Sequence, residues 1–388
     1  MKAFAVKYSF IFLILALFLF SFTQIDLGLT LTKASIFQTI QTSFQTIGYF
    51  NRPLSLAFYL LIISGMFTYY LYFLRQVIRK KINARHIWTL IISTAVILAF
   101  SYNAFSYDLF NYIFDAKIIT HYHLNPYAHR ALDFPGDPML SFMQWTHRLY
   151  PYGPVWLGLT VPLSYIGLNF FLVTFFLFKF LSAAFYLGCC YLIYKINKKI
   201  LPEYQNFNLV LFALNPLVII ESLVSSHNDI AMMFFALLGL YLYFLRKKIL
   251  AIILIIVSSQ IKIPTIALLA PIIISFLPNK IKNDNNKFVY LSIFVMLGTL
   301  GYVLTKLEVQ PWYFLWIMPL IALLKPNRYI IALTFGFSLG LLLRYSVFLY
   351  FGNWDGIALP LRNAFTVFAT IIPVILVFIQ DKFGRKLL

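Results

Sequence analysis

Long apolar stretches separated by short polar segments form the main pattern of this chain. Most of the stretches reach the roughly 17–25 residues that a helix needs to cross a bilayer. They cover residues 8–22, 54–74, 87–105, 169–194, 207–224, 230–245, 249–276, 288–304, 312–324, 329–351 and 357–379. The pattern therefore predicts an all-α polytopic membrane protein, a single integral membrane domain over 1–388, with about twelve transmembrane helices.

Two apolar segments are too short or too broken to be simple crossings. The stretch 249–276 lies between two basic clusters, so we expect it to turn back on itself at the polar segment 258–264. Each arm of about a dozen residues is roughly 20 Å long as a helix. Non-helical backbone at membrane depth occurs only against protein or a water-filled cavity, so we expect a cavity beside this hinge. The segment 155–166 is also short, and we expect a re-entrant or tilted helix there.

The composition supports the membrane assignment and removes other classes. The chain is 61% hydrophobic and 11% charged, whereas a soluble domain has roughly 45–50% apolar and about 25% charged residues. Such hydrophobicity also excludes a disordered chain. The two cysteines, Cys189 and Cys190, are neighbours in an apolar run and do not indicate a disulfide scaffold.

A net charge of +19 raises the question of a nucleic-acid partner. Most of the 31 basic residues, however, collect in alternate connections between the apolar stretches. These clusters are Lys2 and Lys7; Arg75, Arg79, Lys80, Lys81 and Arg85; Lys195, Lys198 and Lys199; Arg246, Lys247 and Lys248; Lys280, Lys282 and Lys287; Lys325 and Arg328; and Lys382, Arg385 and Lys386. The positive-inside rule places both termini and these loops in the cytoplasm of a multi-pass cell-membrane protein, and we expect no nucleic-acid partner.

The polar loop 106–154 is the main candidate for chemistry. It contains four of the 12 acidic residues and four of the six histidines, and unpatterned loops of this length are usually functional. Its first segment has a helical pattern with one polar face, made of Asp108, Asn111, Tyr112 and Asp115. We expect this helix to lie in the membrane interface, with its apolar side in lipid and its carboxylates toward a cavity. A plain amphipathic linker fits the same spacing.

Metal binding is only weakly indicated. His121 and His123 are two residues apart and do not share a helical face, and no cysteine or compact carboxylate cluster accompanies them, which disfavours zinc. No cofactor is indicated with certainty. Mg²⁺ or Mn²⁺ on Asp108 or Asp115 stays open, because oxygen-ligand sites leave little trace in a sequence.

Several ionisable groups lie in or beside apolar stretches, where such groups are functional candidates by default. The segment 225–229, with His227, Asn228 and Asp229, interrupts two apolar helices, and Lys262 lies at the hinge. Each has a structural alternative: an exposed turn for the first and snorkelling to the interface for Lys262. For Lys179, near the middle of its helix, we expect a structural partner within the bundle.

Several short motifs resemble those of bacterial polyprenol-phosphate mannosyltransferases, membrane glycosyltransferases of the GT-C class. They are Tyr107-Asp108-Leu109 with Tyr112, Asp115-Ala116-Lys117, Leu124-Asn125-Pro126-Tyr127, Tyr152-Gly153-Pro154, Glu221-Ser222 with His227-Asn228-Asp229, Ile261-Lys262-Ile263-Pro264, and Gln310-Pro311-Trp312-Tyr313-Phe314-Leu315-Trp316. The motifs follow the family order from about residue 107 to 316. His123 stands where the family often has glycine.

The resemblance implies a GT-C bundle whose long first extracytoplasmic loop, 106–154, is catalytic. It implies transfer of a sugar, most often mannose, from a polyprenyl-phosphate donor to a hydroxyl of a glycan or lipid acceptor at the extracytoplasmic face, with inversion. Asp108 matches the family's general base. The residues assigned to substrate binding are Tyr112, Asp115, Arg148, Tyr152, His227, Asn228, Asp229, Lys262, Trp312 and Tyr313.

Two other classes of function compete with a transferase. A transporter or flippase of a lipid-linked sugar also hides ionisable groups among broken helices, but it usually has related halves, and none is evident in this sequence. A non-catalytic assembly protein would not need Asp108 in a loop so rich in histidine and arginine. Loss of sugar transfer on replacing Asp108, with expression kept, would distinguish the transferase from both.

Overall fold

The computed structural model describes residues 2–276 and 284–383, and all regular structure in these two ranges is helical. The sequence prediction of an all-α protein is confirmed. In chain order the helices are α1 (Lys2–Phe22), α2 (Ser35–Gln45), η1 (Thr46–Phe50), α3 (Arg52–Ile78), α4 (Ala84–Ala99), α5 (Asp108–Thr120), η2 (Ala131–Asp133), η3 (Pro138–Ser141), α6 (Pro154–Ile166), α7 (Phe171–Ile200), η4 (Pro202–Tyr204), α8 (Gln205–Ala213), α9 (Pro216–Ile219), η5 (Ile220–Val224), α10 (Asp229–Phe244), α11 (Lys248–Ser259), η6 (Ile263–Leu268), α12 (Leu269–Ile274), α13 (Asn285–Leu304), η7 (Pro311–Trp316), α14 (Met318–Ile321), α15 (Arg328–Phe351) and α16 (Ala358–Phe383).

Among the described residues, five helices are long and apolar enough to cross a membrane by themselves. They are α3, α7, α13, α15 and α16. A sixth span is obtained if the segments Pro202–Ala213 and Pro216–Val224, which meet at 57°, form one bent crossing. Shorter apolar helices accompany them, so the chain is a membrane protein with several spans. The basic residues at positions 280, 282, 385 and 386 lie outside the described residues.

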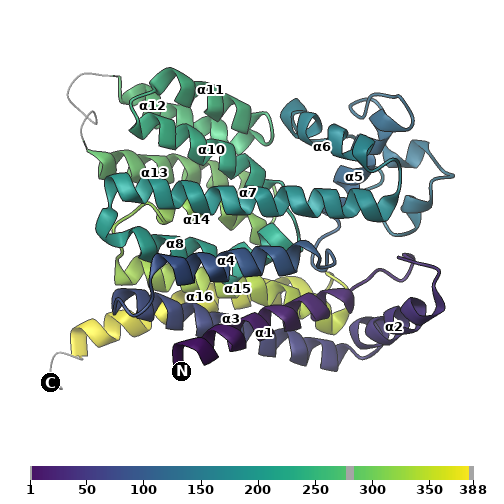
Figure 1. Cartoon of the computed structure of the whole chain (residues 1–388), viewed down its shortest axis with the longest axis horizontal. Helices are drawn as coiled ribbons and strands as arrows, with labels where there is room; N and C mark the ends of the chain where they lie inside the picture. The colour runs from purple at the N-terminus through teal and green to yellow at the C-terminus, as the bar shows by residue number, and fades with distance from the viewer. Residues whose placement is uncertain (1, 277–283, 384–388) are drawn as a thin grey trace.

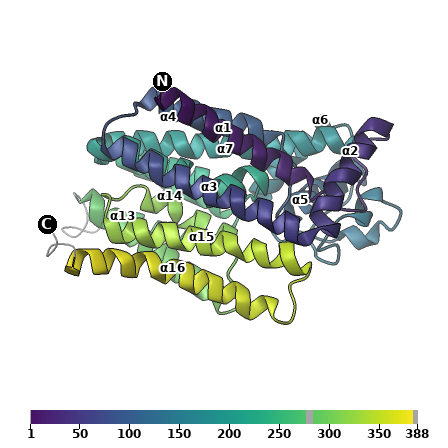
Figure 2. The same cartoon turned by 90° about the horizontal axis from the view of Figure 1, so that it is seen from below.

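The long helices run side by side, and one end of the bundle carries the loop structures (Figures 1 and 2). Helices α2, α5 and α6 lie at this end, whereas α1 begins and α16 ends toward the other. We call it the loop end. The N-terminal part of α7 extends beyond the other long helices to reach α5 (Figure 1).

Helix α5 begins at Asp108, but its apolar side does not face lipid. Leu109, Phe110, Ile113 and Phe114 are all buried in the protein. The ring of Phe110 packs edge-on against Phe142 of the same loop, with 5.4 Å between the ring centroids. The loop after α5 folds back over the helix and supplies this cover, so the expectation of a lipid-facing side was wrong.

The loop that follows α5 is fixed by ionic and backbone features. Lys117 of α5 forms an ion pair with buried Asp137, whose carboxylate also accepts a hydrogen bond of 2.7 Å from the hydroxyl of Tyr122. His123 has a φ of 57°, in the left-handed region that glycine adopts without strain. The turn therefore explains why glycine is frequent at this position in the family that the sequence resembles.

The segment 249–276 turns back on itself, as the sequence predicts. Helix α11 runs to the hinge, and η6 and α12 run back from it. The two ends of the segment therefore lie together, and the Lys248 ammonium donates a 3.0 Å hydrogen bond to the Ser275 carbonyl. At the hinge, the backbone of Gln260 and Ile261 accepts hydrogen bonds from residues 153 and 155 at the start of α6. The non-helical backbone is thus satisfied by protein, and α6 is the short helix expected at 155–166.

Lys179 has the structural partner that the sequence predicts. Its buried ammonium donates hydrogen bonds to the carbonyls of Leu223 and Val224, the latter at 2.9 Å, and to the Ser101 hydroxyl at 3.1 Å. These carbonyls belong to the π-helical turn η5, where helical bonding ends. Lys179 therefore fixes the point at which the chain leaves η5 and enters the segment 225–229.

Candidate active site

The segment 225–229 connects η5 to α10 and is fully buried. Its backbone is held by a 3.0 Å hydrogen bond from the His227 amide to the Glu221 carbonyl. An exposed turn, the structural alternative for these residues, is therefore wrong. The buried position gives the polar side chains of His227, Asn228 and Asp229 protein surroundings instead of solvent.

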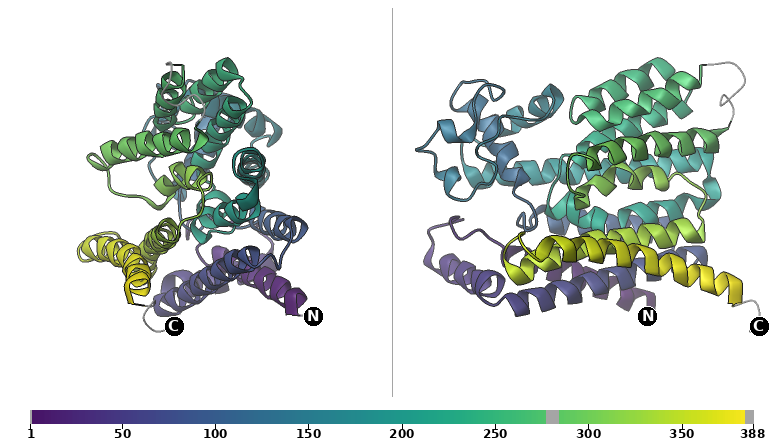
Figure 3. Two further views of the ribbon diagram at one scale, coloured as in Figure 1. Left: turned by 90° about the vertical axis from the view of Figure 1, so that its left-hand side faces the viewer. Right: turned by 180° about the vertical axis from the view of Figure 1, so that it is seen from behind.

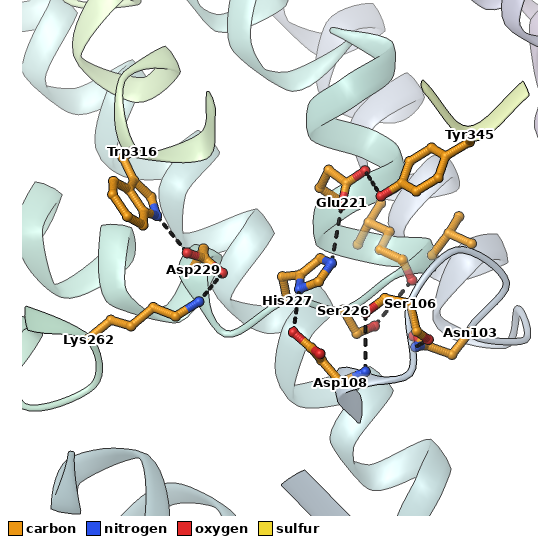
Figure 4. A network of polar contacts seen from close by, with 12 residues as sticks. Asn103, Ser106, Asp108, Glu221, Ser226, His227, Asp229, Lys262, Trp316 and Tyr345 are labelled. Atoms are coloured by element: carbon orange, nitrogen blue, oxygen red, sulfur yellow. Dashed lines mark hydrogen bonds and ion pairs between the residues drawn. The ribbon is translucent and has the colours of Figure 1, made fainter. Parts of the chain in front are cut away.

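The imidazole of His227 lies between two carboxylates (Figure 4). Its Nδ1 is 3.4 Å from Oδ2 of Asp108, and its Nε2 is 3.3 Å from Oε2 of Glu221. The hydroxyl of Tyr345 donates a 3.0 Å hydrogen bond to the other oxygen of Glu221. These four side chains form a continuous polar line, in which His227 and Glu221 are buried and the Asp108 side chain is 16% exposed.

Contacts from α5 and η7 fix two members of this line, Asp108 and His227. Asp108 is the first residue of α5, and its amide donates a 3.1 Å hydrogen bond to the Ser106 hydroxyl. The indole of Trp312, the second residue of η7, stacks on the His227 imidazole with 4.2 Å between ring centroids and 25° between ring planes. The imidazole is therefore restrained by packing as well as by charge.

The electrostatics of the line favour an ionised Asp108. Burial disfavours the imidazolium of His227, but hydrogen bonding and charge from Asp108 and Glu221 outweigh it and raise the pKa of His227 to about 9. For Asp108, burial alone would raise the pKa, yet the His227 hydrogen bond and the charges of His227, Lys262 and Arg148 lower it below its usual value. At neutral pH an ionised Asp108 therefore faces a protonated His227.

A second ion pair borders the same segment. The ammonium of Lys262 donates a 2.8 Å hydrogen bond to Oδ2 of Asp229, and the indole N–H of Trp316 donates one of 2.6 Å to Oδ1. Asp229 is buried, whereas the Lys262 side chain keeps some exposure. Figure 4 shows Lys262 reaching Asp229 while Asp108 reaches His227, two residues away in the same segment. Snorkelling of Lys262 is therefore wrong, since its ammonium bonds to a buried carboxylate.

Aromatic side chains form a wall beside these groups. Tyr112 contacts Tyr152 and Trp156 edge-on, with centroid separations of 5.3 and 5.4 Å. The Lys262 ammonium lies 5.5 Å from the centre of the Tyr152 ring. The ring of Tyr313 packs against that of Trp316, with 4.9 Å between the ring centroids. The wall brings the aromatic residues chosen from the sequence close to Asp108 and Lys262.

Several buried polar atoms near this wall have no hydrogen-bond partner in the part of the chain that the structure describes. They are the Tyr112 hydroxyl, the Trp156 indole N–H and both polar atoms of the Asn228 amide. An unsatisfied buried donor or acceptor costs about 1–3 kcal/mol. Such groups are satisfied when a polar ligand binds, so they are candidate contacts for substrate hydroxyls.

Arg148 and Asp115 are not part of the polar line. Arg148 is exposed, and its guanidinium lies 4.1 Å from the centre of the Trp145 ring. Asp115 is half-buried on α5 and forms no hydrogen bond or ion pair with another described residue. Burial raises the pKa of Asp115 to about 8.

Replacing Asp115 by asparagine should change the turnover number less than about tenfold, because a largely neutral carboxyl and an amide have similar size and charge. The raised pKa of Asp115 also makes the folded state lose stability as pH rises from about 4 through about 8. The variant lacks this loss. Between pH 5 and pH 9, the unfolding temperature of the variant relative to that of the wild type should increase with pH. A difference in unfolding temperature that does not change with pH would contradict the raised pKa of Asp115.

The side chains do not fit a divalent-cation site. Among residues 2–276 and 284–383, no three His, Cys, Asp or Glu side chains are grouped so that they could hold a metal ion. The Oδ2 atom of Asp108 faces an imidazolium, and Asp115 has no second ligand beside it. We therefore assign no step to Mg²⁺ or Mn²⁺.

Three further residues belong to the site but were not selected from the sequence. Glu221 was named in a motif but given no role, although a carboxylate inside an apolar stretch is costly without a function or partner. Trp316 belongs to the same sequence motif as Trp312, but no role was assigned to it from the sequence. Tyr345 had no signal, since it is one of 26 tyrosines and lies in an ordinary apolar helix.

The site can be compared with known proteins. No curated protein and no solved structure matches the chain. A family model described as alpha-(1->6)-mannopyranosyltransferase, N-terminal domain, matches residues 14–277. The matched part contains Asp108, Glu221, His227, Asp229 and Lys262, whereas Trp312 and Tyr345 lie beyond it. The chain belongs to this alpha-(1->6)-mannopyranosyltransferase family and is a membrane glycosyltransferase.

Proposed function

We propose that this enzyme transfers a mannosyl group from a polyprenyl-phosphate donor to a hydroxyl of a glycan or lipid acceptor, with Asp108 as general base. The observation that carries the proposal is the position of the Asp108 carboxylate. It is the partly exposed end of an otherwise buried polar line, and the partly exposed side chain of Lys262 pairs with Asp229, two residues beyond His227 in the same segment.

The reaction on this proposal is a direct displacement at the anomeric carbon. The acceptor oxygen forms a bond to that carbon while the bond from the carbon to the phosphate oxygen breaks, and the phosphate leaves with the electron pair. Asp108 takes the proton of the acceptor hydroxyl as the new bond forms. With one base and no protein nucleophile, a single displacement inverts the anomeric configuration.

The two cationic side chains have different tasks because their exposures differ. Lys262 is partly exposed and contacts the donor phosphate, on which negative charge develops as the bond breaks. His227 is buried and is a positioning residue, which holds the Asp108 carboxylate in place and ionised. Glu221 in turn keeps His227 protonated. The aromatic wall of Tyr112, Tyr152 and Trp156 limits access of water.

The donor is tested by transfer assays with purified enzyme. Radiolabelled mannose on polyprenyl phosphates of several chain lengths is offered with membrane extract as acceptor, and the product is identified by mass spectrometry. Mannose on a nucleoside diphosphate is the comparison donor. Transfer from the nucleotide donor alone, with none from any polyprenyl phosphate, would contradict the proposal.

We further propose a GT-C type bundle of about twelve crossings, in which the shorter apolar helices also cross the bilayer. The basic clusters support a cytoplasmic location for both termini, and the loop 106–154 is then the extracytoplasmic catalytic loop.

This topology predicts which introduced cysteines react with a membrane-impermeant thiol reagent on intact cells. Gln144→Cys, exposed in the loop 106–154, should be labelled, and Lys81→Cys, exposed between α3 and α4, should react only after the membrane is permeabilised. The natural thiols Cys189 and Cys190 are buried and contribute little background. The reverse labelling pattern would invert the orientation.

A further inference from the structure

A second charged cluster lies away from Asp108, between the last two long helices. It contains Arg344 of α15, Arg362 of α16 and Glu308 of the connection before η7. The two arginines are 2% and 7% exposed. Both approach the same oxygen of Glu308, Oε2, from Nη2 at 3.7 and 3.4 Å respectively. Within the described part of the chain, the hydrogen bonds and ion pairs of these three residues do not involve Asp108, His227, Glu221 or Lys262.

The charges and hydrogen bonds of this cluster do not balance. Two buried guanidinium groups share one carboxylate that is itself 45% exposed. The separations exceed the roughly 2.7–2.9 Å of a direct charge-assisted hydrogen bond. Arg344 Nη2 and Arg362 Nε have no hydrogen-bond partner in the described part of the chain. A buried cation with unused donors is unfavourable unless an anion supplies the missing acceptors.

Another nitrogen atom of each arginine helps to hold its guanidinium group in place. Arg344 Nη1 donates a 2.9 Å hydrogen bond to the side-chain oxygen of Asn363. Arg362 Nη2 lies 3.4 Å from the Trp354 carbonyl, and its guanidinium carbon is 4.8 Å from the centre of the Trp354 ring. The unused donors are thus part of a preorganised site, since neither arginine needs them to keep its conformation.

The position of the cluster suggests the class of its ligand. Helix α16 lies at the edge of the bundle beside α15 (Figure 3), and almost none of its apolar stretch is buried in protein. A helix of this kind borders lipid. Arg362 stacks on Trp354, which is exposed, and tryptophan is enriched at the level of the lipid headgroups. The anions at that level are lipid phosphates.

We propose that Arg344 and Arg362 form a binding site for the phosphate group of a membrane lipid. Phosphate oxygens accept from Arg344 Nη2 and Arg362 Nε, and the planar guanidinium fork suits this geometry. Glu308 occupies the site as an internal competitor and moves toward solvent when the lipid binds. The lipid is either a phospholipid, which carries a phosphodiester, or a polyprenyl phosphate, which carries a monoester. This inference does not depend on the role of Asp108.

The test uses Glu308→Gln, which removes the competing charge while the amide keeps the size of the side chain. Native mass spectrometry of the full-length protein is titrated with phosphatidylglycerol, with undecaprenyl phosphate and with dioleoylglycerol, which has no phosphate. Removing the competitor should tighten binding of a phosphate-bearing lipid by about tenfold, and Arg362→Gln should weaken it by at least as much. Binding of dioleoylglycerol should not respond.

Asp355→Asn is the matched control, since Asp355 is an exposed carboxylate of the α15–α16 connection, next to Trp354, and lies outside the cluster. It should leave lipid binding unchanged. Tightening for one lipid supports the site and identifies its source. If Glu308→Gln only lowers the unfolding temperature and tightens neither lipid, the three residues are a structural ion pair and the proposal is wrong. A response to inorganic phosphate without any response to lipid would also overturn it.

Discussion

Asp108→Asn is expected to lower the turnover of sugar transfer by about 10²–10⁴-fold, the usual contribution of a general base. The amide keeps the size of the carboxylate but cannot accept the acceptor proton. Because Asp108 lies at the surface end of its polar line, the change leaves His227 paired with Glu221. Single-turnover rates with saturating donor measure the effect, and donor binding to the variant serves as the control for folding.

The comparison with Asp115→Asn makes this test specific, since both carboxyls lie on α5 but only Asp108 pairs with His227. The pH dependence gives a second check. The lowered pKa of Asp108 means that wild-type turnover should stay high through the acidic range in which an ordinary aspartate becomes protonated. On the alkaline side it should fall as His227 loses its proton near pH 9. If the Asp108 variant kept its turnover and the Asp115 variant lost it, Asp115 would be the base.

Lys262→Gln is expected to lower kcat/KM for the donor by roughly ten- to a hundred-fold, the range for losing one hydrogen bond to a charged group. It also removes the charged partner of buried Asp229, so it should lower the unfolding temperature. Stability and catalysis therefore have to be separated. The double variant Lys262→Gln/Asp229→Asn removes both charges at once.

In the double variant the buried carboxylate is gone, so much of the lost stability should return while donor kcat/KM stays low. Lys262→Arg is the charge-conserving comparison and should recover part of the activity, because an arginine fork differs in shape from an ammonium. Full recovery of donor kinetics in the double variant would show that Lys262 acts only as the partner of Asp229.

Local patterns in the sequence predicted the helical class, the returning segment 249–276 and the internal partner of Lys179. In each case unsatisfied polar groups are costly in the bilayer, which limits the possible structures. An apolar stretch that crosses it must be helical, and a buried ammonium must find acceptors. The motifs with Asp108, His227 and Lys262 were also visible, because charged residues are rare in this chain.

Long-range contacts could not be predicted in the same way. The sequence offers no register between α5 and the segment 225–229, so the Asp108–His227 contact appears only in the fold. The same limit explains the error about α5, whose apolar side has the pattern of a lipid-facing helix. Burial of Phe110 against Phe142 depends on the path of the loop that follows, and helical periodicity cannot distinguish lipid from protein as the apolar partner.

The hydrogen bonds of Lys179 have a consequence for biogenesis. Helix α7 is synthesised before the residues whose carbonyls receive its ammonium, Leu223 and Val224. During insertion the ammonium therefore enters an apolar environment without these acceptors, at a cost of about 2.5–3.5 kcal/mol for a lysine near a helix centre. The apolar remainder of α7 offsets that cost. Once η5 has been made, pairing with Lys179 provides a driving force for lateral assembly of the two segments. The segment 225–229 is then positioned by the same step that relieves the cost of inserting the lysine.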